Sequence, residues 1–433
     1  MSPLAGISAS RRSRDGAQNA ADPRGALHED VPALVPEPRD GLRGARAFKV
    51  SSVAVSTPAT TLRLIGSARH VARAQWDAIA RRGYHRHAWF IMAEGCGAEP
   101  RHVGVYRGGE LAAVIPAFIE RDTLHDDLHA RWYGRARRVA AAVGASLRPS
   151  LAIGAPMSTG SEPLGSDGVL TESVLEEALE LLETEAHSDR IKAIVWPFVD
   201  ADAAAIREAA HERGYRESFA NAEAVIDVDW SSPEEYISSR SKNVQRTLRN
   251  ELAWVHDQGI RVSWETDLRP HAETFDAFYR ASHLARNGRA ASLAPNFFLE
   301  LAKHRTKGVR VQCAWRGHTL LEMAVALDAG GALDLCVSAQ SDETRNGLLH
   351  QHCLCYDPVR VSIADGLSRI HLGPTALYPK VLRGARLSTR MTLVRGLTPV
   401  ARAAVRLLAP ITNSRNRAKH KRLVRRINSE GVS

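Results

Sequence analysis

Three cations at helical spacing form the first pattern in this chain that suggests chemistry. Lys242, Arg246 and Arg249 lie four and three residues apart, so a helix would place them on one face, with Arg240 near its start. Such a row can bind phosphate or carboxylate groups, and each guanidinium offers either group two parallel hydrogen bonds. The same spacing is typical of a solvated helix face, so both interpretations stay open.

The segment His350–Cys355 holds two histidines and two cysteines, which are common zinc ligands. Each histidine lies three residues before a cysteine, and the two pairs fall on different helix faces, so four ligands cannot converge on one ion. We therefore predict no metal and no redox cofactor. The chain's five cysteines show no disulfide spacing, which favours the reducing cytoplasm as its location.

Positive charge is concentrated in residues 395–426, which hold ten Lys or Arg and no acid. The whole chain has 58 Lys and Arg, so the remainder carries 48, which equals its number of Asp and Glu. We predict a basic tail over 395–433 whose first part, Arg395–Ile411, is an amphipathic helix. Three roles stay open for it: binding tRNA phosphates, peripheral contact with an anionic inner-membrane face, or solubility alone.

Apolar periodicity predicts the elements that position these residues. Residues 1–60 have the composition of a disordered segment. A helix is predicted over Ser67–Arg82, and the best helix of the chain over Ser232–Gly259, where Ser232–Glu235 forms a capping box and the final glycine ends the helix. No apolar run approaches the about 18 residues that cross a bilayer.

The second half shows a particular order of elements. Three strands are predicted first, followed by a loop, a helix interrupted at Pro358, and a short strand; their ranges are Val309–Arg316, Leu320–Asp328, Ala332–Ala339, Gln340–Gly347, Leu348–Gly366 and Arg369–Leu372. This order resembles the core of a GNAT acyltransferase. The segment Leu372–Gly384 has a glycine, then a lysine, then an Arg-Gly ending. With the helix at Tyr236–Asn250, it resembles the FemAB-like, peptidoglycan biosynthesis/recognition branch of that superfamily.

The first half also alternates strands and helices. We therefore predict an α/β (α+β) fold of two tandem GNAT-like subdomains with mixed sheets, over residues 61–229 and 230–394, with the site in the cleft between them. A disordered N-terminus and a basic helical C-terminal tail complete this prediction.

The resemblance implies a direct transfer, in which an amine attacks a bound thioester or aminoacyl ester. Backbone amides of a splayed strand, assigned to Leu320–Asp328, would stabilise the oxyanion, and Asn346 and Gly347 would hold the donor. The loop Ser341–Gly347 has one glycine and two acids, unlike the loops that bind CoA. Aminoacyl-tRNA is therefore preferred to acyl-CoA as donor, with an amine of a cell-wall precursor or a small metabolite as acceptor.

The resemblance also implies roles for single residues. Glu322 is the first candidate for the general base and Asp334 the second, Lys380 stabilises negative charge, and Tyr356 donates to the oxyanion or the leaving group. Arg383 binds an acceptor carboxylate, and Lys242, Arg246 and Arg249 bind substrate. Each also has an ordinary structural interpretation, as a strand acid, a surface cation or a core tyrosine. Two other functions stay open: an acyl-CoA-dependent GNAT N-acetyltransferase, and a non-catalytic RNA- or membrane-binding protein with this fold.

Overall fold

The computed structural model describes residues 59–121, 146–165, 168–288, 293–304, 308–341 and 347–429. The predicted disordered segment, 1–60, lies outside these residues except for its last two positions. Asn346, predicted to bind the donor, also lies outside them.

The first half of the chain alternates strands and helices. Helix α5 shows why: Thr171 caps its first turn, and Leu175, Leu179 and Leu182 recur every three or four residues and are buried. In chain order the elements are β1 (Thr60–Ile65), α1 (Arg73–Ala78), α2 (His87–Gly95), β2 (Glu99–Pro100), β3 (His102–Arg107), β4 (Glu110–Ile115), β5 (Ala117–Glu120), β6 (Ser150–Ile153), β7 (Leu164–Gly165), α5 (Glu172–Ser188), β8 (Ala193–Asp200), α6 (Ala204–Glu212) and β9 (Arg216–Asp227).

The second half confirms the predicted order of three strands, a helical segment and a strand. Its elements are α7 (Pro233–Ser238), α8 (Lys242–Asp257), β10 (Ile260–Glu265), α9 (Ala272–Asn287), α10 (Phe297–Lys303), β11 (Val309–Arg316), β12 (Thr319–Ala329), β13 (Ala332–Gln340), α11 (Leu348–Gln351), a π-helical turn (His352–Tyr356), α12 (Asp357–Ala364), β14 (Arg369–Gly373), α13 (Leu377–Leu382), β15 (Arg386–Gly396) and α14 (Pro399–Ser429).

Two predicted helices are shorter than their apolar spacing suggested. The helix over Ser67–Arg82 is only α1 with a 3-10 turn before it. The helix over Ser232–Gly259 breaks between α7 and α8. At this break the Ser239 hydroxyl donates to the Tyr236 carbonyl at 2.7 Å, and Ser241 is extended. Serine side chains that bond to nearby backbone compete with the helix, which explains the break.

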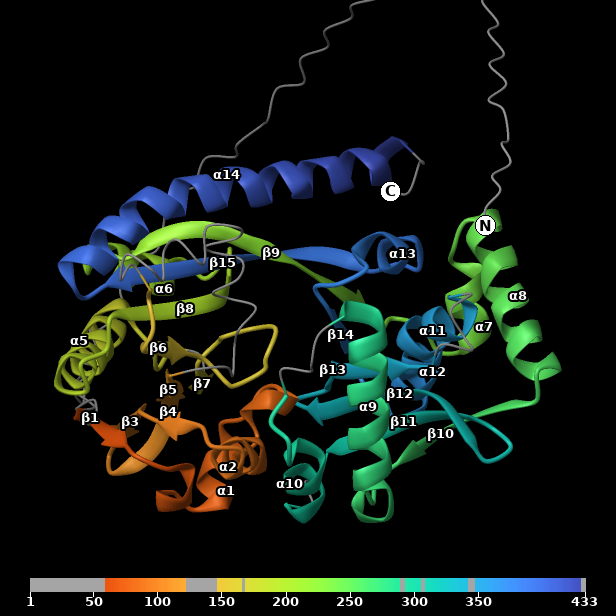
Figure 1. Ribbon diagram of the computed structural model, residues 1–433, viewed down its shortest axis with the longest axis horizontal. Coiled ribbons are helices and arrows are strands. Elements are labelled where there is room, and N and C mark those ends of the chain that lie inside the picture. The colour runs from red at the N-terminus through yellow and green to blue at the C-terminus, as the bar shows by residue number, and fades with distance from the viewer. Residues whose placement is uncertain are drawn as a thin grey trace, which may run out of the picture. The chain divides into compact units, whose positions relative to one another are not determined.

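An eleven-stranded sheet connects the two halves, in the order β10-β11-β12-β13-β14-β9-β15-β8-β6-β5-β2, beside a four-stranded sheet, β1-β3-β4-β7. Strand β15, near the chain's end, lies between β9 and β8 of the first half, as Figure 1 shows. The subdomain boundary predicted at residue 229 lies just after β9 in the sequence. The sheet is nevertheless continuous, because strands from the two sides of this boundary pair with one another.

Two pairs of parallel strands separate after a short region of pairing. Strands β13 and β14 pair at only three positions, the last being Asp334 with His371, although β13 continues to Gln340. Strands β6 and β8 likewise pair at three positions. The prediction that Leu320–Asp328 is the splayed strand is wrong, because this segment, in β12, pairs with β11 and β13 along its length. The strands that separate are instead β13 and β14, after their three parallel pairs, and we call this separation the β13–β14 gap.

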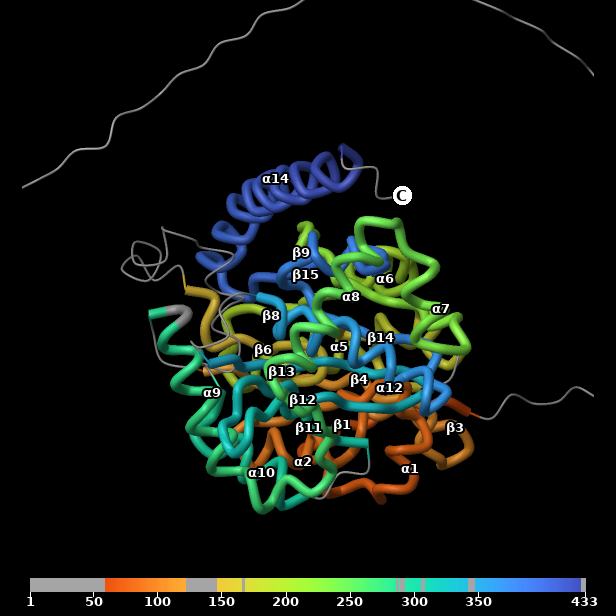
Figure 2. The backbone as a smooth tube through the Cα atoms, turned by 90° about the vertical axis from the view of Figure 1, so that its right-hand side faces the viewer, coloured from red at the N-terminus to blue at the C-terminus, as the bar shows by residue number. Residues whose placement is uncertain are grey.

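The segment predicted as a basic tail is a long helix packed on the sheet. Helix α14 contacts β9 and β15, and both Figure 1 and Figure 2 show it lying along them. Its buried side chains recur at three- or four-residue spacing, and include Ala401, Val405, Ala409 and Thr412. All nine Lys and Arg of α14 are exposed, and the helix contains no acid. The charges therefore belong to the outer surface of a folded element.

Candidate active site

Charged side chains occupy neighbouring strands at the junction of the two halves. Their strands follow one another in the sheet: Asp334 (β13), His371 (β14), Glu223 (β9), Arg390 (β15) and Asp200 (β8). Two residues of first-half loops, Arg82 and Glu162, complete this charge network. Asp334 and His371 form the last pair before β13 and β14 separate, so the network lies at the closed end of the β13–β14 gap.

Arg82 and Arg390 hold the carboxylates of the network together. Arg82 Nε donates to Asp334 Oδ1 at 3.1 Å, and Arg82 Nη2 lies 3.4 Å from Glu223 Oε1. Arg390 donates to Glu162 at 2.7 Å, to Asp200 at 2.9 Å and to Glu223 at 2.5 Å. Two guanidinium groups thus face four carboxylates.

Glu223 and Arg82 stay ionised although both are buried. Burial alone would raise the pKa of Glu223, but the neighbouring His371, Arg82 and Arg390 outweigh burial and hold this pKa well below its usual value. Burial opposes the charge of Arg82 as well, yet its carboxylate partners raise its pKa. A carboxylate so firmly ionised is a poor proton acceptor near neutral pH. The network is therefore suited to fixing strands and loops around the gap.

A close backbone approach positions Arg82. The turn that starts at Gly83 lies against β12, and a Cβ added to this glycine would meet Leu327 Cβ at 2.1 Å. The amide of Gly83 also donates to Asp334 Oδ2 at 3.0 Å. Only glycine fits this contact, and the contact carries the neighbouring arginine into the network.

Lys380, on α13, bonds to β14 at the residue that follows its last pair with β13. Its side chain is 2% exposed, and its ammonium donates to the Leu372 carbonyl of β14 at 2.5 Å. Leu372 is the extra residue of a bulge in the pairing of β14 with β9. Burial lowers the pKa of Lys380, and nearby Cys355 and Glu223 oppose this effect only in part. A buried cation thus lies against β14 at the residue that follows its last pair with β13.

Strand β13 carries a bulge just after its last pair with β14, and a buried phenol lies near this bulge. In the pairing of β13 with β12, Leu335 and Val337 oppose consecutive residues, so Cys336 is the extra residue. A bulged residue is left out of the strand ladder, and here it interrupts the pairing of β13 with β12. The Tyr84 side chain is 1% exposed, and its hydroxyl interacts with the Cys336 thiol. Burial raises the pKa of Tyr84, and Cys336 and Asp334 raise it further, which places the phenol beside the bulge.

Of the predicted catalytic residues, the structure places Lys380 and Asp334 at the gap and the other two elsewhere. Glu322 Oε1 lies 2.6 Å from His350 Nδ1. Glu322 lies on β12, and Leu327 of the same strand pairs with Asp334. The two β12 residues are five positions apart, which is about 17 Å along the strand. Tyr356 is in the π-helical turn, where its ring lies 5.3 Å from that of His352.

The predicted binding residues are also dispersed. Arg383 is buried and forms an ion pair with Glu251 of α8. This pair explains the position of Arg383 without an acceptor carboxylate. Gly347 begins α11 in a left-handed conformation. The row of cations predicted to bind substrate, Lys242, Arg246 and Arg249, lies on the exposed face of α8.

Comparison with protein families matches residues 67–426 to the FemAB-like family, described as peptidoglycan biosynthesis/recognition. The chain belongs to this family. The match spans both halves and includes the gap, the network and most of α14. The family and the fold support a transferase of acyl or aminoacyl groups.

Solved structures with the same fold include FemX, with 14% identity, a TM-score of 0.52, and coverage of 78% of this chain and 99% of FemX. A second is the C-terminal domain of a putative lysylphosphatidylglycerol synthetase from Agrobacterium fabrum, with 11% identity, a TM-score of 0.50, and coverage of 78% and 94%. A tandem GNAT protein from the clavulanic acid pathway has 10% identity and a TM-score of 0.46, and covers 79% of this chain and 99% of its own. The predicted α/β fold with mixed sheets is confirmed by the strand order and by the match to the FemAB-like family.

No curated protein sequence matches this chain. Within the described residues, no helix has both the length and the apolar character needed to cross a bilayer.

Sequence reasoning missed most of the network of this FemAB-like chain. Arg82 was placed at the end of a helix, and Glu223 and Arg390 lie in strands without any distinguishing motif. Tyr84 follows Gly83 in a 3-10 turn, and the glycine is the only residue in the sequence that indicates this turn. No short spacing connects these residues, because strand pairing brings them together across more than a hundred positions.

Proposed function

We propose that this FemAB-like protein transfers an aminoacyl group from aminoacyl-tRNA to an amine of a cell-wall precursor, in the β13–β14 gap. The carbonyl carbon of the donor ester accepts the amine nitrogen. The ester C–O bond then breaks, the tRNA hydroxyl leaves, and the amine proton passes to a carboxylate or to water. The observation that carries this proposal is the separation of β13 from β14, with a bulge at Cys336 on the first strand and the Lys380 ammonium bonded to the second.

Two features support the roles within the gap. The oxyanion of the tetrahedral intermediate needs preorganised donors, and a buried ammonium beside a bulged strand supplies them. The four carboxylates of the network exceed its two guanidinium groups, which favours the approach of an ammonium-bearing acceptor. Lys380 is thus the proposed stabiliser of negative charge, as the resemblance implied.

The exposed surface of α14 supports tRNA as donor. Nine cations without an acid on one helix would contact several phosphates, and such binding weakens steeply with salt. An acyl-CoA donor is the second candidate, because the second half keeps the order of elements that resembles a GNAT acyltransferase core.

A binding experiment distinguishes aminoacyl-tRNA from acyl-CoA as the donor. The full chain is titrated with charged tRNA and with acetyl-CoA, and compared with a variant in which Arg422 and Arg425, both exposed on α14, become glutamine. We expect salt-sensitive binding of charged tRNA, weakened about tenfold or more in the variant at low salt. Micromolar binding of acetyl-CoA, equal in both proteins and without binding of tRNA, would replace the proposal by the acyl-CoA alternative.

Tyr84→Phe tests whether the phenol takes part in transfer. Its hydroxyl is buried beside the Cys336 thiol, which is a weak hydrogen-bond partner, so its removal should change the unfolding free energy by less than about 1 kcal/mol. If the hydroxyl donates to the leaving group, kcat should fall by about tenfold to a hundredfold. Tyr215→Phe, at another buried tyrosine outside the gap, is the matched control and should leave kcat unchanged. Equal rates for both variants would remove Tyr84 from the mechanism.

A further inference from the structure

His371 lies on β14 where the β13–β14 gap opens, and the transfer proposed above gives it no chemical role. It forms the last parallel pair, with Asp334, and the next residue, Leu372, accepts the hydrogen bond of the Lys380 ammonium. The side chain of His371 is 10% exposed. An imidazole is therefore present one residue from the position where the buried ammonium bonds to β14.

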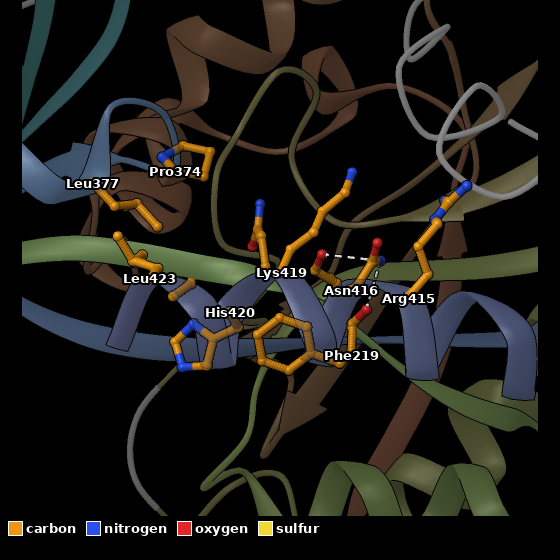
Figure 3. Close-up of a pocket in the computed structure, with 11 residues that line it drawn as sticks. Phe219, Pro374, Leu377, Arg415, Asn416, Lys419, His420 and Leu423 are labelled. Carbon is orange, nitrogen blue, oxygen red and sulfur yellow. Dashed lines mark hydrogen bonds between the residues drawn. The ribbon is translucent and has the colours of Figure 1, made fainter. Parts of the chain in front are cut away.

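The ring of His371 is directed at the charge network. Side chains alternate between the two faces of a strand, and Ile370, the residue before it, is buried in the apolar core. The ring therefore lies on the opposite face, where it meets Glu223. The chain beyond β14 turns elsewhere: Figure 3 shows Pro374 and Leu377 near α14, where they line a cavity whose lining does not include His371. The ring thus belongs to the gap and not to the surface of α14.

Glu223 is placed to orient this ring. His371 Nδ1 lies 3.3 Å from Glu223 Oε1, without the alignment of a hydrogen bond. Catalytic hydrogen bonds are often poorly aligned until the substrate binds. Glu223 itself is fixed, because Thr159 donates to Oε1 at 2.7 Å and Arg390 to Oε2 at 2.5 Å. A carboxylate beside Nδ1 favours the tautomer with the proton on that nitrogen and leaves a lone pair on Nε2.

The neighbouring carboxylates are less suited than the ring to accept the proton of an amine. Asp334 accepts hydrogen bonds from Arg82 through Oδ1 and from the Gly83 amide through Oδ2. Glu223 is held ionised by its cationic neighbours, which lower its pKa. In contrast, His371 Nε2 takes part in no hydrogen bond or ion pair within the described residues. Imidazole is also the side chain that most often takes and gives protons in enzymes.

We propose that His371, oriented by Glu223, is the general base of the transfer, an inference that rests on the proposed function. The acceptor arrives as an ammonium, and Nε2 takes its first proton and passes it to water. The free amine then attacks the carbonyl carbon of the donor ester. As the C–N bond forms, Nε2 takes the second proton, and it gives this proton to the tRNA hydroxyl oxygen when the ester C–O bond breaks. The ring ends neutral, and Lys380 keeps its charge throughout.

The charges around the ring favour its protonated form during this step. Glu223 of β9 faces Nδ1, and Asp334 of β13 is the strand pair of His371. The cations on this side are Arg82 and Arg390, which bond to these carboxylates and to others of the network. Because the four carboxylates of the network outnumber its two guanidinium groups, an imidazolium between two of them is stabilised.

The test measures single-turnover transfer from a mixed pool of charged tRNA, at saturating concentration, to a peptidoglycan stem peptide with a free lysine amine. We expect His371→Ala to lower the rate about 100-fold or more, and added imidazole to raise the rate of this variant about tenfold or more. His420→Ala is the matched control. His420 is half-buried, its ring lies 5.1 Å from that of Phe219, and it lines the cavity in Figure 3. Its variant should keep the wild-type rate and should not respond to imidazole.

Nuclear magnetic resonance of the full chain with 15N-labelled histidine tests the ring without any substrate. The signals lost in His371→Gln identify the ring, and we expect a proton on Nδ1 and a lone pair on Nε2 near neutral pH. A proton on Nε2 would overturn the proposal, because the ring could not then accept one at that atom. A slow His371→Ala that imidazole does not accelerate would overturn it as well, since the role would be structural.

The outcomes also separate this role from the proposed function. If the wild type transfers nothing to the peptide, the proposed function fails and the role of His371 fails with it. If the wild type transfers and His371→Ala does so at the same rate, the role of His371 alone is overturned.

Discussion

Replacing Arg390 by methionine is expected to lower the unfolding free energy by about 3–5 kcal/mol. The side chain of Arg390 is 3% exposed and bonds to Glu162, Asp200 and Glu223. Methionine fills much of the same volume, so the cost comes from the carboxylates that lose their cation in a buried place. Urea unfolding, followed by circular dichroism, measures this cost from the midpoint and the slope.

Arg386→Met is the matched control for this change. Arg386 lies on the same strand, four residues earlier, and pairs with Asp227 at 2.6 Å, but its side chain is 52% exposed. An exposed pair contributes less than about 1 kcal/mol, so this variant should unfold close to the wild-type midpoint. If both arginine variants lost the same small amount of unfolding free energy, burial of the network would have no effect on stability.

The pH dependence of the Arg390→Met effect has a definite sign. In the wild type, Glu162 and Glu223 have a lowered pKa in the folded state because of Arg82 and Arg390, despite burial. Their contribution to stability is present above the unfolded-state pKa of about 4.3 and is lost as the pH falls toward the lower folded-state pKa. The difference between wild type and variant should therefore be largest near neutral pH and narrow below about pH 4.

The strands of the second half could be predicted because each signal was local. The apolar run Val309–Arg316 coincides with β11, and β12 and β13 differ from their predicted ranges by only one residue at one or both ends. Glycines with positive φ at Gly317 and Gly330–Gly331 end these strands, and such turns are readable from residue type alone. The same is true of Gly259, which follows α8 with positive φ.

The active-site network could not be predicted in this way, because its contacts are not local. Arg82 and Asp334, which share a hydrogen bond, are 252 positions apart in the sequence. The sequence of a buried strand does not indicate which of its polar residues will bond to a residue of the other half of the chain. Asp334 was selected because it lies on a predicted central strand, but Arg82, the residue that fixes it, has no pattern around it.

The basic C-terminal segment shows a different limit. Its composition dominated the prediction of a tail, while the buried stripe that packs α14 on the sheet is made of small or polar residues such as Ala401, Ala409 and Thr412. Such residues give a weak amphipathic signal, although they allow a helix to approach a sheet closely. Removal of residues after Val394 would therefore expose the sheet, and point substitutions on α14 test its charges better.

Lys380→Met is expected to lower kcat by about 100- to 1000-fold, because it removes the only ammonium that the described structure places in the gap. The affinity for the donor should not change, since the stabilised charge exists only in the transition state. The folded protein should be as stable as the wild type or more stable, because a buried ammonium with a pKa lowered by burial gives way to an apolar side chain. Single-turnover rates, donor affinity and urea unfolding together separate catalysis from folding.

The pH profile distinguishes a cationic role of Lys380 from a role as base. If the ammonium stabilises the oxyanion, kcat should fall as the pH rises through its pKa, which burial places below the usual value of about 10.4. If the neutral amine instead accepted the proton of the acceptor, kcat would rise through that same pKa. In either case, the residual kcat of Lys380→Met should not change with pH over this range. If kcat falls in the wild type and not in the variant, the charge belongs to Lys380, because no other lysine of the described residues bonds to β14.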